Sequence, residues 1–464
     1  MSRATATDLV YLIAIVGFIL ALKGLSSPRH ARRGNLAGAA GMLIAVAWTF
    51  SLPQVYGQTR NLVLIVVAVV IGAAIGVPAA RMVKMTAMPQ MVAIFNGVGG
   101  GAAALVSFTE FIATPGKSLA IYKICEILFG VLVGSISFAG SGVAFAKLQE
   151  LMTGRPITYP AQQPINAALG LTIVVLLILT VITANTAVLV VVLFLSLGLG
   201  AIFVLPIGGA DTPVLISLLN AFTGLAVAAS GFTLNSTLLI VAGTLVGASG
   251  TLLTRMMSNA MGRSLPNILF SAFGSVVTAT GGTDEESRPV RSGTAEDIAV
   301  LLAYAHKVAI VPGYGLAVAQ AQHTARELAD ALAARGVEVY YAIHPVAGRM
   351  PGHMNVLLAE ANVPYEQLEE MDDANADMQT TDVALVVGAN DTVNPAAKNT
   401  PGSPIYGMPI INADQATNII FLKRSMRPGF AGIDNDLLYD PKTTMLFGDA
   451  KDSLSKLVAA VKAA

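Results

Sequence analysis

The feature that most constrains this chain is a series of nine apolar stretches in its first 260 residues. A helix that crosses a bilayer needs about 20 apolar residues, and each stretch is that long or nearly so. Only 12% of the 464 residues are charged, against roughly 25% in ordinary soluble proteins. This deficit excludes a purely soluble protein, a disordered chain and a nucleic-acid binder that relies on bulk positive charge. We therefore expect a polytopic α-helical membrane domain with spans near Leu9–Leu25, Leu36–Leu52, Leu62–Ala80, Met88–Phe108, Leu119–Phe145, Ile165–Ala184, Val188–Leu205, Pro213–Phe232 and Ser236–Met257.

Small residues are concentrated in two of these stretches, over Gly97 to Ala104 and Gly243 to Gly250. Lipid gives no hydrophobic drive for helices to associate, so membrane helices pack through small residues that let their backbones approach. We expect close helix–helix contacts at both places.

The positive charges between the apolar stretches predict an orientation. Ten Lys and Arg residues fall on one side of the membrane, and three, Arg3, Arg60 and Lys117, fall on the other. Positive loops stay in the cytoplasm, so the N-terminus is expected outside and the C-terminal half inside. The first positive cluster follows the first apolar run instead of preceding it, which disfavours a signal peptide over residues 1–25.

Few polar side chains lie within the predicted spans. Glu126 is near the start of the fifth span, and Asp211 is in the loop Gly208–Pro213 that enters the eighth. Asn96 and Asn220 are polar but uncharged. Such groups are costly in a membrane and often mark ion pathways, so we predict that these four residues line one. Interhelical hydrogen bonding is the alternative.

The charge balance changes sign along the chain. Up to Thr283 there are 14 Lys and Arg against 5 Asp and Glu, and after it there are 14 against 23. Between the halves, Met261–Thr283 is apolar but broken by proline and glycines, and we interpret it as an interfacial or hinge segment. A tenth span is the alternative, but it would place the next domain outside. The predicted parts are a transmembrane domain over 1–260, a hinge over 261–294 and a soluble domain over 295–464.

The soluble half has an alternating helix and strand pattern. Glu296–Ala305 is predicted as a helix, Lys307–Pro312 as a buried strand, Ala317–Arg335 as a helix and Val337–Ile343 as the next strand. This order predicts a βαβ unit in a doubly wound parallel sheet, a Rossmann-like α/β fold. Further strands are expected at Val383–Val387, Pro409–Asn412, Ile419–Leu422 and Thr444–Phe447, with a last helix over Ser453–Ala463.

A glycine-rich turn follows the first of these strands. Gly313-Tyr314-Gly315-Leu316-Ala317-Val318 is a variant of the dinucleotide-binding fingerprint, with Val318 in place of the third glycine. In that motif the turn and the start of the helix face the pyrophosphate. The position between strand and helix predicts nucleotide binding, and a plain glycine turn is the alternative.

The residues after two other strands favour NADP over NAD. The second strand ends in Tyr341–Pro345 without the carboxylate that would hold a ribose 2′-hydroxyl. Lys423-Arg424-Ser425 offers two cations and a hydroxyl for a 2′-phosphate. A solvated basic turn is the alternative interpretation of Lys423-Arg424-Ser425.

Two further loops are candidate parts of the nucleotide site. Gly348–Asn355 is glycine-rich and carries Arg349, and Gly388–Pro395 follows a strand end and carries Asp391. The acidic stretch Glu366–Asp377 is interpreted as a solvated face, with a docking surface as the second possibility. The five histidines are scattered, and the single cysteine excludes a disulfide within the chain and a cysteine-cluster metal site. Neither a catalytic Ser/His/Asp arrangement nor a metal-ligand cluster is predicted.

Several strings together resemble the beta-subunit family of proton-translocating NAD(P) transhydrogenases over nearly the whole chain. They are Val311-Pro312-Gly313-Tyr314-Gly315-Leu316-Ala317-Val318-Ala319-Gln320-Ala321-Gln322, Gly348 to Asn355, Gly388 to Pro395, Lys423-Arg424-Ser425 and Leu446-Phe447-Gly448-Asp449-Ala450-Lys451.

This resemblance implies an activity and its partners. Hydride would pass between NAD(H) on a separate alpha subunit and NADP(H) on this chain, driven by proton movement through the helices. A homodimer of the complete unit in a bacterial inner membrane is also expected. The resemblance assigns Asp211 and Asn220 to proton passage and coupling. The candidate cofactor-binding residues are Gly313, Tyr314, Gly315, Ala317, Val318, Arg349, Met350, Gly388, Asn390, Asp391, Lys423, Arg424, Ser425, Gly448 and Asp449.

One position departs from the family pattern. Well-known members carry a histidine where this chain has Asn96, and an asparagine holds no proton at neutral pH. Asn96 can therefore conduct only through water or hydrogen bonds, and the titratable relay is supplied by another subunit or the route differs. A transporter or channel gated by a cytoplasmic NADP-sensing domain would share the layout without redox chemistry. A structural membrane anchor is a third class, which the fingerprint disfavours.

Overall fold

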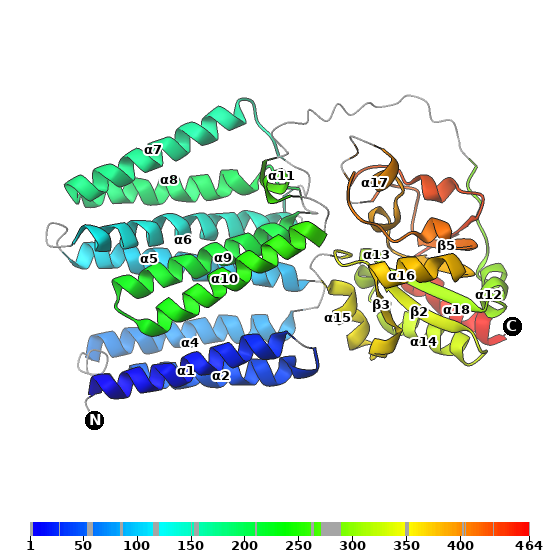
Figure 1. Ribbon diagram of the computed structural model, residues 1–464, viewed down its shortest axis with the longest axis horizontal. Helices are drawn as coiled ribbons and strands as arrows, with labels where there is room; N and C mark the ends of the chain where they lie inside the picture. The colour runs from blue at the N-terminus through cyan, green and yellow to red at the C-terminus, as the bar shows by residue number, and fades with distance from the viewer. Residues whose placement is uncertain are drawn as a thin grey trace. The chain divides into compact units, whose positions relative to one another are not determined.

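The computed structural model consists of two compact units. It describes residues 3–26, 28–52, 59–83, 87–114, 120–149, 151–152, 157–208, 211–260, 264–270, 289–348, 352–400, 403, 405–429 and 431–463. The first unit comprises residues 1–207 and 214–254, and the second comprises 208–213 and 255–464. Figure 1 shows a bundle of long helices and an α/β domain.

The first unit is built from long apolar helices. Within the described residues, eight helices are long and apolar enough to cross a membrane, which confirms eight of the nine predicted spans. The ninth, Leu36–Leu52, lies in a 23-residue helix whose first turns carry Arg29, Arg32 and Arg33, so its apolar part is shorter. The helices are α1 (Arg3–Leu25), α2 (Pro28–Phe50), α4 (Thr59–Met82), α5 (Met88–Ala113), α6 (Ile121–Leu148), α7 (Gln162–Thr183), α8 (Thr186–Val204), α9 (Thr212–Thr233) and α10 (Thr237–Ala260).

Small residues bring two pairs of these helices into backbone contact, as predicted. A Cβ on Gly134 of α6 would lie 2.6 Å from the carbonyl oxygen of Gly100 on α5. A Cβ on Gly224 of α9 would lie 2.8 Å from the carbonyl oxygen of Gly243 on α10. Larger side chains would separate these backbones and the polar groups between them.

The second unit contains a six-stranded parallel sheet in the order β3-β2-β1-β4-β5-β6. The chain starts in the middle at β1, winds outward to β3 and then crosses to β4 on the other side. The reversal between β1 and β4 leaves a crevice at the carboxyl ends, where open α/β sheets bind ligands. The strands are β1 (Lys307–Pro312), β2 (Glu338–Ile343), β3 (Leu368–Glu370), β4 (Val383–Val387), β5 (Asn418–Lys423) and β6 (Thr443–Phe447).

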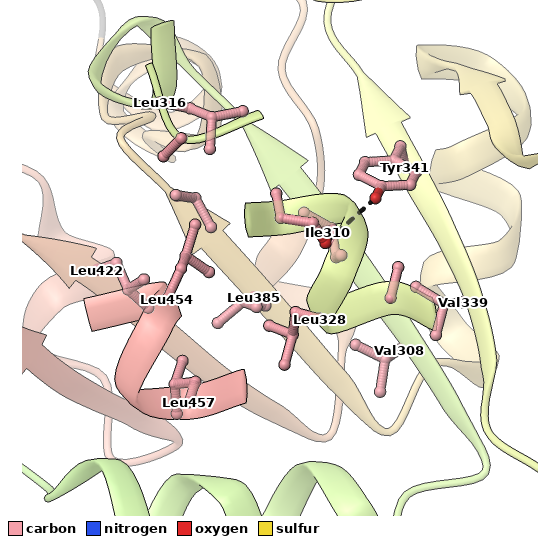
Figure 2. Close-up of a cluster of buried hydrophobic side chains, with 14 of the residues drawn as sticks. Val308, Ile310, Leu316, Leu328, Val339, Tyr341, Leu385, Leu422, Leu454 and Leu457 are labelled. Atoms are coloured by element: carbon pink, nitrogen blue, oxygen red, sulfur yellow. Dashed lines mark hydrogen bonds between the residues drawn. The ribbon is translucent and has the colours of Figure 1, made fainter. Parts of the chain in front are cut away.

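Apolar cores lie on both faces of this sheet, so the predicted doubly wound fold is confirmed. On one face, Val308 and Ile310 of β1 pack with Leu328 and with Leu454 and Leu457, as Figure 2 shows. On the other face, alternate strand residues such as Ala309 and Val311 pack with Met378. The helices are α12 (Ala295–Ala303), α13 (Tyr314–Val318), α14 (Gln322–Ala333), α15 (His353–Glu360), α16 (Met371–Asp377), α17 (Ala396–Asn399) and α18 (Ala450–Ala463).

Two predicted elements of the soluble domain were wrong. The helix expected over Ala317–Arg335 is two helices, α13 and α14, because Gln320 between them has a left-handed φ of +50°. The strand expected at Pro409–Asn412 does not form. The N–H of Ile411 donates to the carbonyl oxygen of Thr392 (3.0 Å), outside any strand.

One strand was missed. β3 lies within the acidic stretch Glu366–Asp377 that we interpreted as a solvated face. It is only three residues long and pairs with β2 at the edge of the sheet. Edge strands need not be apolar, so its acidic sequence gave no strand pattern. Met261–Thr283 lies largely outside the described residues, which include α11 (Leu265–Phe270) within it.

Candidate functional site

The glycine turn after β1 lies against the loop after β4. The N–H of Gly313 donates to the carbonyl oxygen of Val387, and the N–H of Gly315 donates to that of Gly388, both at 2.9 Å. Gly388 has a left-handed φ of +66°. These bonds join the two loops at the carboxyl edge of the sheet, on either side of the topological reversal.

Close packing within the chain explains why this turn contains glycines. A Cβ on Gly313 would collide with the backbone of Ala389, and one on Gly315 would lie 2.7 Å from the Cα of Gly388. The turn therefore requires glycines in order to pack on the β4 loop, whether or not a phosphate lies there. The helix that follows, α13, has five residues; its Ala317 is buried and its Val318 is half-exposed.

The β4 loop is joined to the end of β5 by a chain of polar contacts. Lys423 Nζ donates to Asn390 Oδ1 (3.1 Å), and Asn390 Nδ2 donates to Asp391 Oδ1 (3.1 Å). The other carboxylate oxygen of Asp391 accepts the N–H of Ala431 (2.9 Å). Three predicted site residues, from the end of β5 and the β4 loop, therefore form one hydrogen-bonded group.

The sequence does not indicate the segment that packs on this group. A Cβ on Gly429 would lie 2.6 Å from Asn390 Nδ2, so only a glycine fits beside the Asn390 and Asp391 side chains. Asn435 Nδ2 donates to the carbonyl oxygen of Asn390 (3.0 Å). These residues lie in an irregular stretch after β5, and their part in the loop depends on contacts that no local pattern reveals.

Burial affects the charge of Lys423. The side chain is half-buried, and loss of solvent lowers the pKa of its ammonium group. The nearby carboxylates of Asp391 and Asp434 favour the charged form and oppose this effect without cancelling it. An anionic ligand at this place would add a further negative charge that stabilises the ammonium form.

Arg424 turns toward a different partner. Its Nη2 lies 2.6 Å from Asp449 Oδ2, at the beginning of α18. Burial alone would raise the pKa of Asp449, but the hydrogen bonds from Arg424 and from the N–H of Lys451 outweigh it and hold that pKa below its usual value. The N–H of Gly448 donates to the carbonyl oxygen of Lys423 (3.1 Å), which joins the β6 turn to the end of β5. Ser425, next along, is exposed.

The loop after β2 is only partly described. Arg349 and Met350 lie outside the described residues. Gly348 has a φ of +102° and packs against the buried ring of His353. His344 is buried as well; its Nε2 contacts the carbonyl oxygen of Pro409 (2.7 Å), and its Nδ1 accepts the N–H of Val346 (3.2 Å). Burial lowers the pKa of His344, and both contacts suit the neutral ring.

In the helical unit, Asn96 is the centre of a buried hydrogen-bond network. Its Nδ2 donates to Ser141 Oγ (2.9 Å) and to Ser137 Oγ (3.3 Å) on α6. Ser137 Oγ also lies 2.6 Å from Thr223 Oγ1 on α9 and donates to the carbonyl oxygen of Leu219. The sequence indicates Asn96 but neither serine nor Thr223, because hydroxyls are common in membrane helices and the sequence does not show which of them face one another.

The other three predicted pathway residues have environments of their own. Glu126 and Asn220 are half-buried, and Glu126 Oε2 has no hydrogen-bond partner among the described residues. Asp211 is buried, with its N–H bonded to the carbonyl oxygen of Gly208 (3.1 Å). A second hydroxyl pair, Ser107 and Ser230 (3.1 Å), joins α5 to α9.

Comparison with known proteins decides the family. The model of the family described as NAD(P) transhydrogenase beta subunit matches residues 7–460. The chain belongs to this family. It is 50% identical over 464 residues to the NAD(P) transhydrogenase subunit beta of Rhodospirillum rubrum, across 98% of this chain and 99% of the relative. The same values hold for the subunit beta of a named strain of that species.

Membership in the transhydrogenase beta-subunit family confirms the resemblance seen in the sequence. The chain is a subunit of a membrane enzyme that uses NAD(P)(H). A beta subunit also implies a partner alpha subunit.

Proposed function

We propose that this chain is the NADP(H)-binding and proton-translocating subunit of its transhydrogenase. Two cationic side chains, Lys423 and Arg424, lie at the carboxyl edge of a sheet whose order reverses between β1 and β4. This observation carries the proposal, because open α/β sheets bind dinucleotides at that reversal and cations there suit a 2′-phosphate. The second strand ends without an acid for a 2′-hydroxyl, which favours NADP over NAD.

The residues present fit such a nucleotide. Gly313, Tyr314 and Gly315, with Ala317 and Val318 behind them, would line the pyrophosphate. Gly388, Asn390 and Asp391 would lie beside the nucleotide together with Arg349 and Met350. Lys423, Arg424 and Ser425 would take the 2′-phosphate, with Gly448 and Asp449 at its border. Lys423 is half-buried and its pKa is lowered, so a bound anion would stabilise the charged form of its side chain.

The nicotinamide supplies the hydride chemistry, and this chain's residues supply positioning. An alpha subunit with its own membrane helices would hold NAD(H) so that two nicotinamides meet. Coupling requires two states of this chain with different NADP(H) contacts. The hinge over 261–294, which connects the proposed domains 1–260 and 295–464, is one candidate for the part that differs between the two states. The loops at Arg349 and Lys423, within the second domain, are the other candidates.

For proton passage we propose the Asn96 network with Glu126, Asp211 and Asn220. Asn96 cannot titrate, so its part is to order hydroxyls and water. Its bonds to Ser137 and Ser141 suit that part, because hydroxyls both donate and accept hydrogen bonds. The proton itself would be held by a carboxylate of this chain or by a group of the alpha subunit.

The loop charges support an arrangement in a bacterial inner membrane with the N-terminus outside and the soluble domain in the cytoplasm. A homodimer of the complete unit is proposed with it, with lipid around the helices and no nucleic-acid partner. The ten-to-three distribution of loop Lys and Arg residues is the observation that supports this orientation.

The test uses the complete complex in sealed vesicles. We expect NADPH to reduce an NAD analogue, and an imposed proton gradient to change the rate. Analogue reduction without any response to the gradient would contradict proton coupling. NADP(H) binding without analogue reduction would favour the second candidate, a transporter or channel gated by NADP.

A further inference from the structure

Arg424 is already held by an anion of the chain itself. Its Nη2 donates to Asp449 Oδ2 at 2.6 Å. Asp449 is fixed in turn, because its Oδ1 accepts the N–H of Lys451 (3.0 Å) at the start of α18. One carboxylate oxygen of Asp449 therefore accepts a hydrogen bond from the first turn of α18, and the other accepts one from Arg424.

This pairing conflicts with a phosphate on the same guanidinium group. A 2′-phosphate that binds Arg424 must displace or share the Asp449 carboxylate, and two anions close together repel each other. We propose that Asp449 is a specificity-determining residue that competes with the 2′-phosphate for Arg424 and so weakens and tunes NADP(H) binding. The inference rests on the proposed function, which assigns the 2′-phosphate to the Lys423–Ser425 segment.

The exposure of the pair sets the size of the effect. The side chains of Arg424 and Asp449 are 64% and 35% exposed. Ion pairs between exposed groups shift an equilibrium by at most about fivefold. The carboxylate therefore lowers affinity without abolishing it, and NADP(H) can be released again. A nucleotide without the 2′-phosphate has no such competitor.

Asp449→Asn tests this inference cleanly. Asparagine caps helices as well as aspartate does, so α18 keeps its start while the charge is lost. We expect the purified full chain with Asp449→Asn to bind NADP+ about two- to fivefold more tightly in calorimetric titration. NAD+ affinity should stay unchanged. Asp452→Asn removes the same charge from the first turn of α18 and should change NADP+ binding much less.

A double variant separates a specific competition from a general charge effect. On an Arg424→Ala background, Asp449→Asn should no longer tighten NADP+ binding, because the contested cation is gone. Unchanged or weaker NADP+ binding in the single variant would overturn the inference, as would an equal gain in Asp452→Asn or on the Arg424→Ala background. If the unaltered chain binds NADP+ no better than NAD+, the phosphate site itself fails, and the inference fails with it.

Discussion

At the residue scale, single side chains at the sheet edge have environments that their sequence neighbours do not set. Lys423 and Arg424 are adjacent, yet Lys423 contacts the β4 loop and Arg424 contacts the start of α18. The sequence showed two cations together, and the structure shows that one is half-buried and the other exposed and paired.

The first prediction concerns this pair. We expect the double variant Lys423→Ala and Arg424→Ala to weaken NADP+ binding by at least about tenfold, because two charge-assisted contacts would be lost. NAD+ lacks the 2′-phosphate and should lose little affinity. Calorimetric titration of the purified full chain measures both, and an equal loss for the two nucleotides would contradict the assignment.

The second prediction is a pH dependence. The pKa of Lys423 is below its usual value in the fold, so the ammonium form is lost as pH rises through that lowered pKa. A phosphate binds the charged form, so NADP+ affinity should fall as pH rises through the lowered pKa, at a pH below the ordinary lysine value of about 10.4. The folding stability of the chain without nucleotide depends on pH with the opposite sign. Between the lowered pKa and the ordinary one the unfolded chain binds more protons, so stability rises with pH.

Lys423→Arg is the control for this pH dependence. Arginine stays charged over the whole range, so the decline in affinity should become much shallower. An identical decline in this variant would assign the titration to another group.

At the element scale, the paired loops after β1 and β4 act as one unit. Gly388 combines a left-handed φ with a Cβ position that the backbone of Gly315 and Leu316 already fills. Such a position tolerates no other residue without moving both loops. The sequence indicated the first loop by its motif, but the contact between the loops follows from the strand order.

The third prediction compares two glycines. Gly336 also has a positive φ, of +86°, but open space around it. We expect Gly336→Ala to cost about 1 kcal/mol of unfolding free energy from backbone strain alone. Gly388→Ala should cost clearly more and also weaken NADP+ binding. Thermal unfolding and titration of the full chain measure the two effects, and similar losses in both variants would contradict the close-packing argument.

The helical elements lead to a fourth prediction. Ser137 joins Asn96 on α5 to Thr223 on α9. Ser137→Ala removes the shared hydroxyl at little cost in volume, so proton-coupled turnover in vesicles should fall severalfold while NADP+ affinity stays the same. Ser249→Ala removes a hydroxyl whose hydrogen bond among the described residues stays within α10, to the carbonyl oxygen of Val246, and should leave turnover near normal. Equal turnover in the two variants would assign Ser137 a packing role.

At the scale of the whole molecule, the chain joins a unit of long apolar helices to an α/β unit. The two halves of the sequence carry net charges of opposite sign. The loop Gly208–Pro213 leads into α9 of the helical half. Asp211 lies in this loop and is buried there. A buried carboxylate at the start of a membrane helix is suited to hold a proton, so Asp211 is a candidate proton carrier.

The fifth prediction follows from this position. In the complete complex, Asp211→Asn should reduce proton-coupled turnover by about tenfold or more, because the amide holds no charge. The NADP+ affinity of the same preparation should stay within about twofold, since the nucleotide site is unchanged. Normal proton uptake during turnover would show that Asp211 has a structural role.

The sequence by itself determined the class of both halves, because hydrophobic length and strand–helix alternation are local properties. It predicted the first and last residues of β1 and β4 correctly, and it contains the glycine and basic motifs that lie at the sheet edge. It failed at β3, which is short and acidic, and at Pro409–Asn412, whose apolar residues are buried without strand pairing.

Only the tertiary structure decided which polar groups meet. Asn96 with Ser137 and Thr223, and Arg424 with Asp449, are pairs separated by many residues. A hydrogen bond or an ion pair needs its two groups within about 3 Å, and such distances between remote residues are set by helix packing and strand order. The sequence could name the groups that carry charge, but the fold alone determines which of them are partners.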